Sequence, residues 1–248
     1  MWNGKDVSVV LMTYAERDSI RAVVDGFLAT GYVDEVVVVD NNAEPGTREA
    51  VAGTPARVVA EPRQGYGHAT RRGLQEARGE LVVIVEPDGT FLPEDITKLL
   101  VYSGECDVVL GTRTTRELIW ADANMDWFLR WGNWAVAKLI EVLFNTVHLS
   151  DVGCTYRVLR RPVARRVAAE MQVGGSHAGV EIMLLALTSG ARVVEVPLNY
   201  LPRVGTSSVT GRRLVAIGVG LRMIGLILRF RRRTPRGTTR PAAFVRGA

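Results

Sequence analysis

Apolar runs of strand length alternate with segments of helical pattern along the first 110 residues. The run 81–85 is apolar at every position, which is typical of a central strand covered on both faces of a sheet. This alternation predicts an α/β fold in which right-handed βαβ units build a mostly parallel sheet. We expect strands at 7–13, 35–40, 57–60, 81–85 and 107–110, and helices at 19–29, 68–77 and 94–102.

Two carboxylates follow the central apolar run directly. Glu86 and Asp88 are separated by one proline and precede a Gly-Thr turn. Open α/β sheets bind their ligands in the crevice at the carboxyl ends of the strands. Two oxygen donors at that edge suit Mg²⁺ or Mn²⁺ bridging a diphosphate. An acidic, solvated turn after a buried strand is the alternative explanation of the same pattern.

A dinucleotide-binding Rossmann domain is the first alternative fold, because Asp40 ends the second strand where such domains carry a ribose-binding acid. The chain reads MTYAERDS after the first strand, so the G-x-G-x-x-G pocket for a pyrophosphate is missing. Gly65, Gly67 and Gly73 follow only after the third strand. A sugar-nucleotide pyrophosphorylase would need a glycine-rich loop with arginine after the first strand, and this is absent as well.

Length and composition restrict the possible domain organisation and metal content only in part. The 248 residues, 47% of them hydrophobic, suffice for one domain of ordinary size. Cys106 and Cys154 lack metal-ligand spacing and the three histidines are scattered, so we expect no zinc site. The N-terminal segment lacks the basic region of a secretory signal, so we expect a cytoplasmic protein.

Charge is divided unevenly along the chain. No acidic residue follows Glu195, and the remainder carries 11 arginines. Removing these from the 31 basic residues leaves 20 against 26 acidic ones, so the body is formally −6 and the tail +11. A basic tail on an acidic body predicts an anionic partner, either nucleic acid or a membrane surface. Nucleic acid is disfavoured because the basic residues are not interleaved with aromatic side chains.

The tail also contains an apolar segment, 214–228, interrupted only by Arg222. As a helix it spans about 22 Å, short of the about 30 Å of a hydrocarbon core. We therefore predict an amphipathic membrane-surface helix at 212–233 and a basic, disordered tail at 234–248. A helix packed on the domain or in a homo-oligomer interface is the alternative.

Four of the five tryptophans lie between residues 120 and 149. Trp127, Trp131 and Trp134 are spaced i, i+4 and i+7, so they share one face of a helix. Interfacial tryptophans favour contact with a membrane. A core helix packed on the sheet would explain the same spacing.

Seven short motifs follow one another along residues 6–208. They are Thr13-Tyr14-Ala15-Glu16, Val39-Asp40-Asn41-Asn42, Gly65-Tyr66-Gly67 with Ala69 and Gly73, Glu86-Pro87-Asp88, Gly111-Thr112-Arg113, Asp151 to Arg157, and Arg203-Val204-Gly205-Thr206-Ser207. In turn they resemble the P-T-Y-N-E, V-D-D-x-S, N-x-G-x-x-x-A, D-x-D, G-S-R, D-x-x-S-G-F-R and R-x-G-x-S motifs of family 2 glycosyltransferases with the GT-A fold. The chain most resembles the polyprenol-phosphate (dolichol-phosphate) mannosyl- and glucosyltransferases.

The resemblance implies a GT-A domain over residues 1–211 that takes a UDP- or GDP-linked sugar together with Mg²⁺ or Mn²⁺. It implies that Asp88, with Glu86 in place of the first aspartate of D-x-D, binds the metal, and that Asp40 contacts the nucleotide base. Arg71 or Arg203 would stabilise the charge of the diphosphate. The donor-binding residues are then Thr13, Tyr14, Glu16, Asp40, Asn41, Gly67, Arg71, Glu86, Pro87, Asp88, Arg203 and Ser207.

The expected reaction is transfer of a hexose with inversion, and the acceptor decides which groups it needs. A lipid phosphate is already anionic at neutral pH, because its second pKa is about 6, and it needs no base. Arg113 and Arg157 are then expected to hold the acceptor phosphate. A hydroxyl acceptor needs a carboxylate base, and Asp151 or Glu181 is the candidate.

Departures from the family pattern keep three hypotheses open. The first is transfer to a polyprenyl phosphate by a protein peripheral at the cytoplasmic face of the cell membrane, which the tryptophans and the tail favour. The second is transfer to a hydroxyl of a glycan, lipid or small metabolite, because Ser208 stands where lipid-phosphate enzymes carry lysine. The third is a weakened GT-A domain that only binds, because Met12 and Glu86 replace the family's proline and aspartate.

Overall fold

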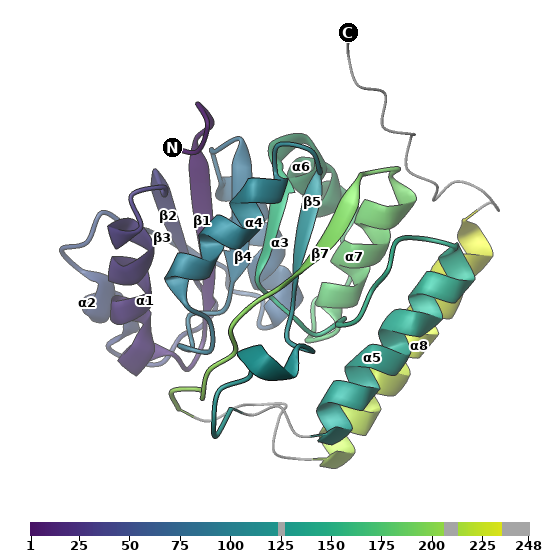
Figure 1. Ribbon diagram of the computed structural model, residues 1–248. Coiled ribbons are helices and arrows are strands. Elements are labelled where there is room, and N and C mark those ends of the chain that lie inside the picture. Colours follow the sequence, from purple (N-terminus) through teal and green to yellow (C-terminus); the bar gives the residue numbers. More distant parts are fainter. Residues whose placement is uncertain (124–126, 206–212, 235–248) are drawn as a thin grey trace, which may run out of the picture.

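The computed structural model describes residues 1–123, 127–205 and 213–234. Within these residues seven strands form one sheet in the order β3-β2-β1-β4-β6-β5-β7 (Figure 1). The strands are β1 (Val7–Thr13), β2 (Glu35–Asp40), β3 (Arg57–Ala60), β4 (Leu81–Val85), β5 (Val108–Thr112), β6 (Arg157–Arg160) and β7 (Val193–Pro197).

The sheet is mostly parallel. Strands β3, β2, β1 and β4 pair in parallel, as do β5 and β7, whereas β6 runs antiparallel between β4 and β5. Every residue of β1 and β4 is buried, as expected for strands covered on both faces. The predicted α/β class is confirmed, and so are the five strands expected from the apolar pattern.

Helices cover both faces of the sheet. On one face, α1 (Arg17–Ala29), the short α2 (Thr47–Val51) and α4 (Ile96–Tyr102), which follows the 3₁₀ turn Pro93–Asp95, pack on the side chains that include Val9 and Leu11. On the other, α3 (Tyr66–Glu76), α6 (Arg161–Glu170) and α7 (Ala178–Thr188) pack on those that include Val10 and Ile84. A second 3₁₀ turn, Arg116–Leu118, follows β5.

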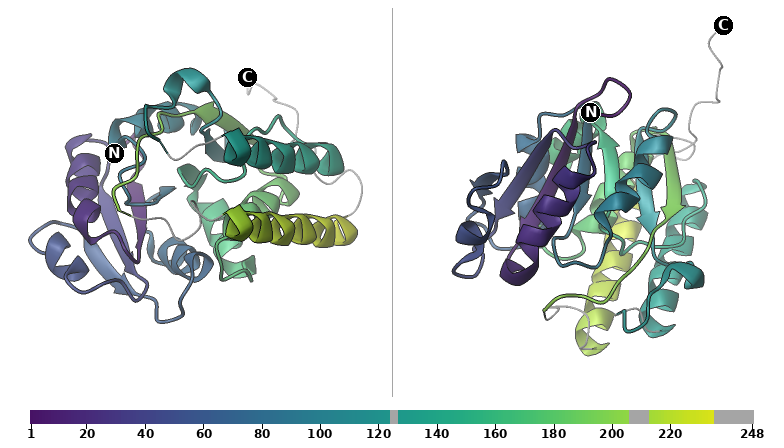
Figure 2. Two further views of the ribbon diagram at one scale, coloured as in Figure 1. Left: turned by 90° about the horizontal axis from the view of Figure 1, so that it is seen from below. Right: turned by 60° about the vertical axis from the view of Figure 1, so that its left-hand side comes forward.

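Two long helices lie side by side beyond the β7 end of the sheet, as Figures 1 and 2 show. They are α5 (Trp127–Phe144) and α8 (Arg213–Arg233), and α8 also contacts α7. Val136 and Ile140 of α5 and Ile227 of α8 belong to the core. The described part of the chain contains no helix that is both long and apolar enough to cross a membrane.

The predicted tryptophan face exists and points outward. Trp127, Trp131 and Trp134 are 65%, 56% and 40% exposed, and Trp131 and Trp134 meet edge to face. Ile217 and Leu221 of α8 are exposed as well. We call these five side chains the apolar patch. Of the predicted basic tail, only Thr234 falls within the described residues.

Candidate active site

The loops at the carboxyl ends of the strands enclose one cavity of about 720 Å³. Residues after β1, β4 and β5 line it, together with the N-terminal turn of α3 and the segment that follows β7. Helices α5 and α8 close its other side. This is the edge at which open α/β sheets bind ligands, so the cavity is the candidate site.

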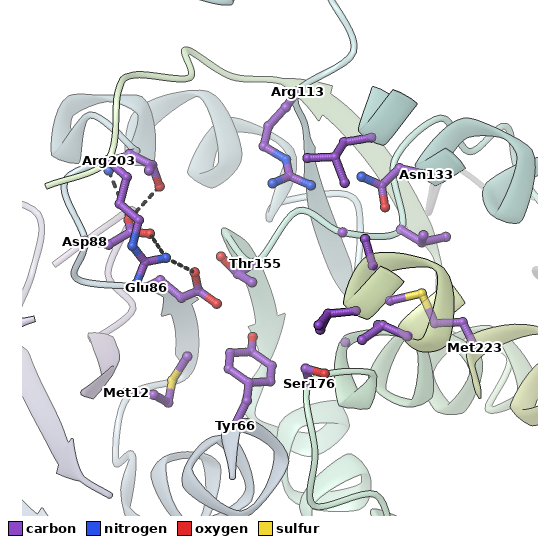
Figure 3. A pocket seen from close by; sticks show the side chains of 18 of the residues that line it. Met12, Tyr66, Glu86, Asp88, Arg113, Asn133, Thr155, Ser176, Arg203 and Met223 are labelled. Carbon is purple, nitrogen blue, oxygen red and sulfur yellow. Dashed lines mark hydrogen bonds and ion pairs between the residues drawn. The ribbon is translucent and has the colours of Figure 1, made fainter. Parts of the chain in front are cut away.

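At one end of the cavity a single arginine joins the acidic side chains (Figure 3). Arg203 donates from Nη1 to Asp88 Oδ2 at 2.8 Å and from Nη2 to Glu16 Oε1 at 2.7 Å. Glu86 Oε2 lies 3.9 Å from the same Nη1. Arg203 Nε is buried and has no hydrogen-bond partner in the described part of the chain. Three carboxylates therefore share one positive charge.

Asp88 is fixed by the turn that follows it. Its Oδ1 accepts hydrogen bonds from Thr90 N at 3.0 Å and Thr90 Oγ1 at 2.6 Å, and the side chain is almost fully buried. The backbone N–H groups of Val204 and Leu201 donate to the carbonyls of Asp88 and Thr90. The segment that carries Arg203 is thereby bound to the loop after β4, which explains why the two motifs meet.

Glu86 sits in an electrostatically unfavourable position. Its side chain is 31% exposed and lines the cavity. Burial among its neighbours, and then the negative charge of Asp88, raise the pKa of Glu86 to about 7, while Arg203 opposes the rise. The carboxyl is thus partly protonated near neutral pH, and added positive charge at this place would favour its ionised form.

The carboxylates at this end of the cavity could ligate a hard divalent cation only together with other ligands. No cluster of three or more His, Cys, Asp and Glu side chains suited to a metal occurs among the described residues. Glu86 and Asp88 offer two carboxylates, and Mg²⁺ or Mn²⁺ is commonly held by one or two carboxylates, with phosphate and water completing the shell. The residues present therefore fit a cation that binds together with a diphosphate.

The motif after β1 lines the cavity through Thr13, Tyr14 and Glu16. Glu16 Oε2 accepts from the backbone N–H groups of Tyr14 at 2.7 Å and Ala15 at 2.9 Å, so the loop curls around this carboxylate. Thr13 is buried, whereas Tyr14 is half exposed. All three predicted residues of this motif thus come together at the cavity.

Of the two predicted donor residues at the end of β2, only one lines the cavity. Asn41 lines the cavity, donates to the carbonyls of Glu61 and Arg63, and accepts from Gly65 N at 2.8 Å. Asp40 accepts from Ala43 N and pairs with Arg48, and it is not a lining residue. Its predicted contact with the nucleotide base remains a prediction.

Of the four other predicted donor residues, the three that the structure describes do not line the cavity. Gly67 N donates to Gly174 O at 2.9 Å, and a Cβ on Gly67 would lie 2.0 Å from Val173 O, so glycine is needed there for packing. Arg71 Nε donates to Ala168 O, and Pro87 O accepts from Ser19 Oγ. The fourth, Ser207, lies outside the described residues.

Across the cavity from Arg203, the side chain of Arg113 points inward beside Asn133 (Figure 3). Arg113 donates from Nε and Nη2 to the two oxygens of Asp151, at 2.8 and 3.0 Å, and its guanidinium carbon lies 5.1 Å from the centre of the Tyr200 ring. A side-chain hydrogen bond also joins Arg113 to Tyr200, which still leaves part of its five N–H groups unused by the described residues. Arg113 therefore retains N–H capacity for an anion in the cavity.

Asp151 is occupied on both oxygens. Besides Arg113, it accepts from Gly153 N at 2.8 Å. Burial alone would raise its pKa, but the charge and hydrogen bonds of Arg113 outweigh burial and hold the pKa of Asp151 below its usual value. A carboxylate with a lowered pKa and no free oxygen is a poor base, so this geometry does not favour the predicted role.

The side chains of Arg157 and Glu181, like that of Asp151, are held by hydrogen bonds to backbone groups. Arg157 borders the cavity but is almost fully buried, and it donates to the carbonyls of Cys154, Gly179 and Val152. Glu181 accepts from the backbone N–H groups of Gln172 and Val173. Both side chains stabilise loops, so the geometry favours Arg113 over Arg157 for binding an acceptor phosphate.

Sequence reasoning missed one wall of the cavity. Five apolar side chains line the cavity on this side: Phe128 and Val136 of α5, and Val215, Val219 and Met223 of α8. We call this the apolar wall. Arg222, the residue that interrupts the apolar run 214–228, also lines the cavity. The run 214–228 signalled a buried or lipid-facing helix, but nothing in it indicated that the helix reaches the site.

Known proteins resemble this chain over most of its length. An uncharacterized glycosyltransferase of Mycobacterium tuberculosis is 32% identical over 209 residues, which are 83% of this chain and 89% of that protein. The dolichyl-phosphate hexose transferase of Haloferax volcanii is 30% identical over 207 residues, 82% of this chain and 86% of its own length.

Solved structures share the architecture. Glucosyl-3-phosphoglycerate synthase from Mycobacterium tuberculosis, in complex with phosphoglyceric acid, matches with a TM-score of 0.71 at 19% identity, covering 94% of this chain and 82% of that one. The same enzyme in complex with Mn²⁺, UDP and glucosyl-3-phosphoglycerate gives a TM-score of 0.70. At this identity the likeness shows the fold, which is the predicted GT-A fold.

The sequence pattern described as "Glycosyl transferase family 2" matches residues 8–168. This is more than half of the chain, and it includes the first six of the seven motifs in whole or in part. The chain belongs to glycosyltransferase family 2.

Proposed function

We propose that this glycosyltransferase transfers a hexose, with inversion, from a nucleotide-diphospho-sugar to a polyprenyl phosphate at the cytoplasmic face of the cell membrane. The observation that carries the proposal is that one and the same cavity is lined by the carboxylates of Glu86 and Asp88 and by the apolar wall of α5 and α8. A charged donor and a lipid acceptor would meet within it.

The carboxylate end is the proposed donor site. Glu86 and Asp88 would hold Mg²⁺ or Mn²⁺, and the bound cation would neutralise the charge that grows on the leaving diphosphate. Arg203, which lines the cavity beside both carboxylates, would donate to a phosphate oxygen. The glucosyl-3-phosphoglycerate synthase complexes that contain Mn²⁺ and UDP support a divalent cation, and UDP before GDP as the nucleotide.

The opposite end is the proposed acceptor site. Arg113 would bind the acceptor phosphate, whose ionised oxygen attacks the sugar carbon as its bond to the donor phosphate breaks. No proton has to be removed from such an acceptor at neutral pH. This agrees with the contacts of Asp151 and Glu181, which are bound to Arg113 and to backbone N–H groups.

The apolar wall and the apolar patch support a lipid acceptor. The wall would cover the first part of a hydrocarbon chain, and the exposed tryptophans would lie at the membrane surface. Arg229, Arg232 and Arg233 are exposed toward the end of α8 and suit anionic headgroups. The Haloferax relative, by its name a dolichyl-phosphate hexose transferase, supports the same class of acceptor.

A hydroxyl acceptor is the second candidate. The structural neighbours support it, because the complexes with phosphoglyceric acid and glucosyl-3-phosphoglycerate contain a small acceptor and its product. Such an acceptor would still use Arg113 for its phosphate. It would also need a base, and neither Asp151 nor Glu181 has the free oxygen that this role requires.

The test is transfer of label from a panel of UDP- and GDP-sugars, with Mn²⁺ or Mg²⁺, into organic-extractable polyprenyl phosphate. Asp88→Asn should lower the rate at least about a hundredfold, because the variant loses a charge at the metal and diphosphate. Glu94→Gln, which changes an exposed carboxylate on the neighbouring turn, is the matched control. Metal-dependent UDP or GDP release without lipid label would favour the hydroxyl acceptor, and no turnover with any donor would favour a binding module.

A further inference from the structure

A partly buried carboxylate outside all seven motifs holds the loop that carries Asp151. Glu195 of β7 accepts from Ser150 N at 2.8 Å and from Ser150 Oγ at 2.5 Å on one oxygen. Its other oxygen accepts from Asp151 N at 3.0 Å. A carboxylate that bridges two consecutive backbone N–H groups fixes the direction in which the chain enters Asp151.

Through Ser150, the same carboxylate is connected to the residues on both sides of Arg113. Ser150 Oγ lies 2.8 Å from Thr112 Oγ1 and 2.9 Å from Thr114 Oγ1. Asp151 in turn accepts from Arg113 N at 3.1 Å as well as from its side chain. Glu195 thus anchors one network that holds Arg113 from its backbone, from both neighbours and from its guanidinium.

The network leaves Arg113 little freedom. Two of its nitrogens are paired with Asp151, and its guanidinium carbon lies 5.1 Å from the centre of the Tyr200 ring, so the side chain is held on two sides where it lines the cavity. An anion site of this kind binds better when the arginine is already held in place, because less side-chain entropy is lost on binding. None of these contacts involves the carboxylates at the proposed metal site.

We propose that Glu195 is a positioning residue, which orients the Asp151–Arg113 pair so that Arg113 binds the phosphate of the acceptor. The inference rests on the proposed function only for the identity of that acceptor. Glu195 itself contacts no substrate.

The experiment measures calorimetric binding of two probes, farnesyl phosphate and inorganic phosphate, with UDP and Mn²⁺ saturating the donor site. Glu195→Gln keeps the size of the side chain but presents an amide N–H₂ to a backbone N–H donor, so the network loses at least one bond. We expect both probes to bind about tenfold more weakly, which corresponds to a loss of about 1.4 kcal/mol in binding free energy. UDP affinity should stay within about twofold.

Two further variants separate positioning from general destabilisation. Glu35→Gln weakens comparable hydrogen bonds from Ser8 Oγ and Arg78 N at the start of β2, and should leave phosphate binding unchanged. Arg113→Lys abolishes the paired contact with Asp151, so adding Glu195→Gln to it should cost almost nothing more. If the two losses multiply instead, Glu195 does not act through Arg113 and the inference is overturned.

Ser150→Ala covers the case in which Glu195→Gln does not fold, because it removes only the hydroxyl of the network. It should weaken binding of both probes about two- to threefold, and an unchanged affinity would overturn the inference. Failure of the wild type to bind either probe would also overturn it. Glu195-dependent binding of inorganic phosphate, without transfer of sugar to any lipid phosphate, would reject the lipid acceptor and keep the role of Glu195.

Discussion

At the scale of single residues, the donor end of the cavity is short of positive charge. Glu16, Glu86 and Asp88 gather around Arg203, and burial raises the pKa of Glu86 to about 7. Such an arrangement is costly in the free protein, and it becomes favourable when a cation arrives. Strain of this electrostatic kind is typical of functional sites.

This charge shortage predicts a pH-dependent stability. The folded-state pKa of Glu86 is raised above its ordinary value of 4.5, so its protonation stabilises the fold at low pH, and that stability is lost as pH rises through about 7. In EDTA, Glu86→Gln should therefore melt at a higher temperature than the wild type at pH 8. At pH 5 the difference should be small. Equal differences in Tm at the two pH values would contradict the burial of Glu86.

Part of the site could be predicted from individual residues. Glu86 and Asp88 follow a wholly apolar strand, so their place at the edge of the sheet was fixed by the pattern. The partners of Asp151 and Glu181 could not be predicted in this way. Both were proposed as bases from residue type, but backbone N–H groups contact both, and Asp151 also pairs with Arg113. Which loops meet is decided by packing, which spacing along the chain does not reveal.

At the scale of elements, the packing of α3 shows how a motif can serve the fold. Gly65 and Gly67 lie against the loop that follows α6, where a Cβ would approach Gly174 O and Val173 O to 2.2 and 2.0 Å. The resemblance assigned Gly67 to the donor. Close contact between a helix start and a loop explains the glycine without any ligand.

Gly67→Ala tests this explanation. The added Cβ would overlap backbone atoms, so the loop or the helix has to move, and we expect unfolding free energy to fall by about 1–3 kcal/mol. Gly218→Ala, in a helix with no atom within 4 Å of the new Cβ, should instead leave stability unchanged or raise it by up to about 1 kcal/mol. Denaturant unfolding measures both, and a Gly67→Ala protein as stable as the wild type would contradict the packing role.

Elements of the second half were harder to predict than those of the first. The first five strands and their helices follow one repeated βαβ pattern. Strand β6 breaks it, because it inserts antiparallel between β4 and β5. Its four residues, RVLR, carry arginine at both ends and resemble no buried strand. Arg157 is buried there only because three carbonyls receive its N–H groups.

At the scale of the whole molecule, α5 and α8 join the cavity to the surface. Both helices line the site and also carry the exposed side chains of the apolar patch, of which Ile217 borders the cavity as well. The sequence indicated separately an apolar, arginine-rich helix and a helix with three tryptophans on one face, and it left open whether that face is exposed or packed on the sheet. That the two helices lie side by side could not be predicted, because about seventy residues of sheet and helix separate them.

Membrane association is predicted at this scale. The protein should float with vesicles rich in anionic lipid, and less well with neutral vesicles or in high salt. Trp131→Ala should lower partitioning about tenfold, since it removes a large exposed aromatic from the patch. Tyr102→Ala, at an exposed aromatic on α4, is the matched control. Equal partitioning of the two variants would argue against the patch as the membrane contact.

The most direct test of the central claim is the dependence of kcat/KM on acceptor chain length, measured with isopentenyl, farnesyl and undecaprenyl phosphate in detergent. If the apolar wall binds the lipid chain, kcat/KM should rise by at least about tenfold from the shortest to the intermediate acceptor and then level off. Val219→Asp in the wall should abolish the rise while leaving the isopentenyl rate similar. Equal kcat/KM values for all three, with 3-phosphoglycerate used as well as any of them, would contradict a lipid acceptor.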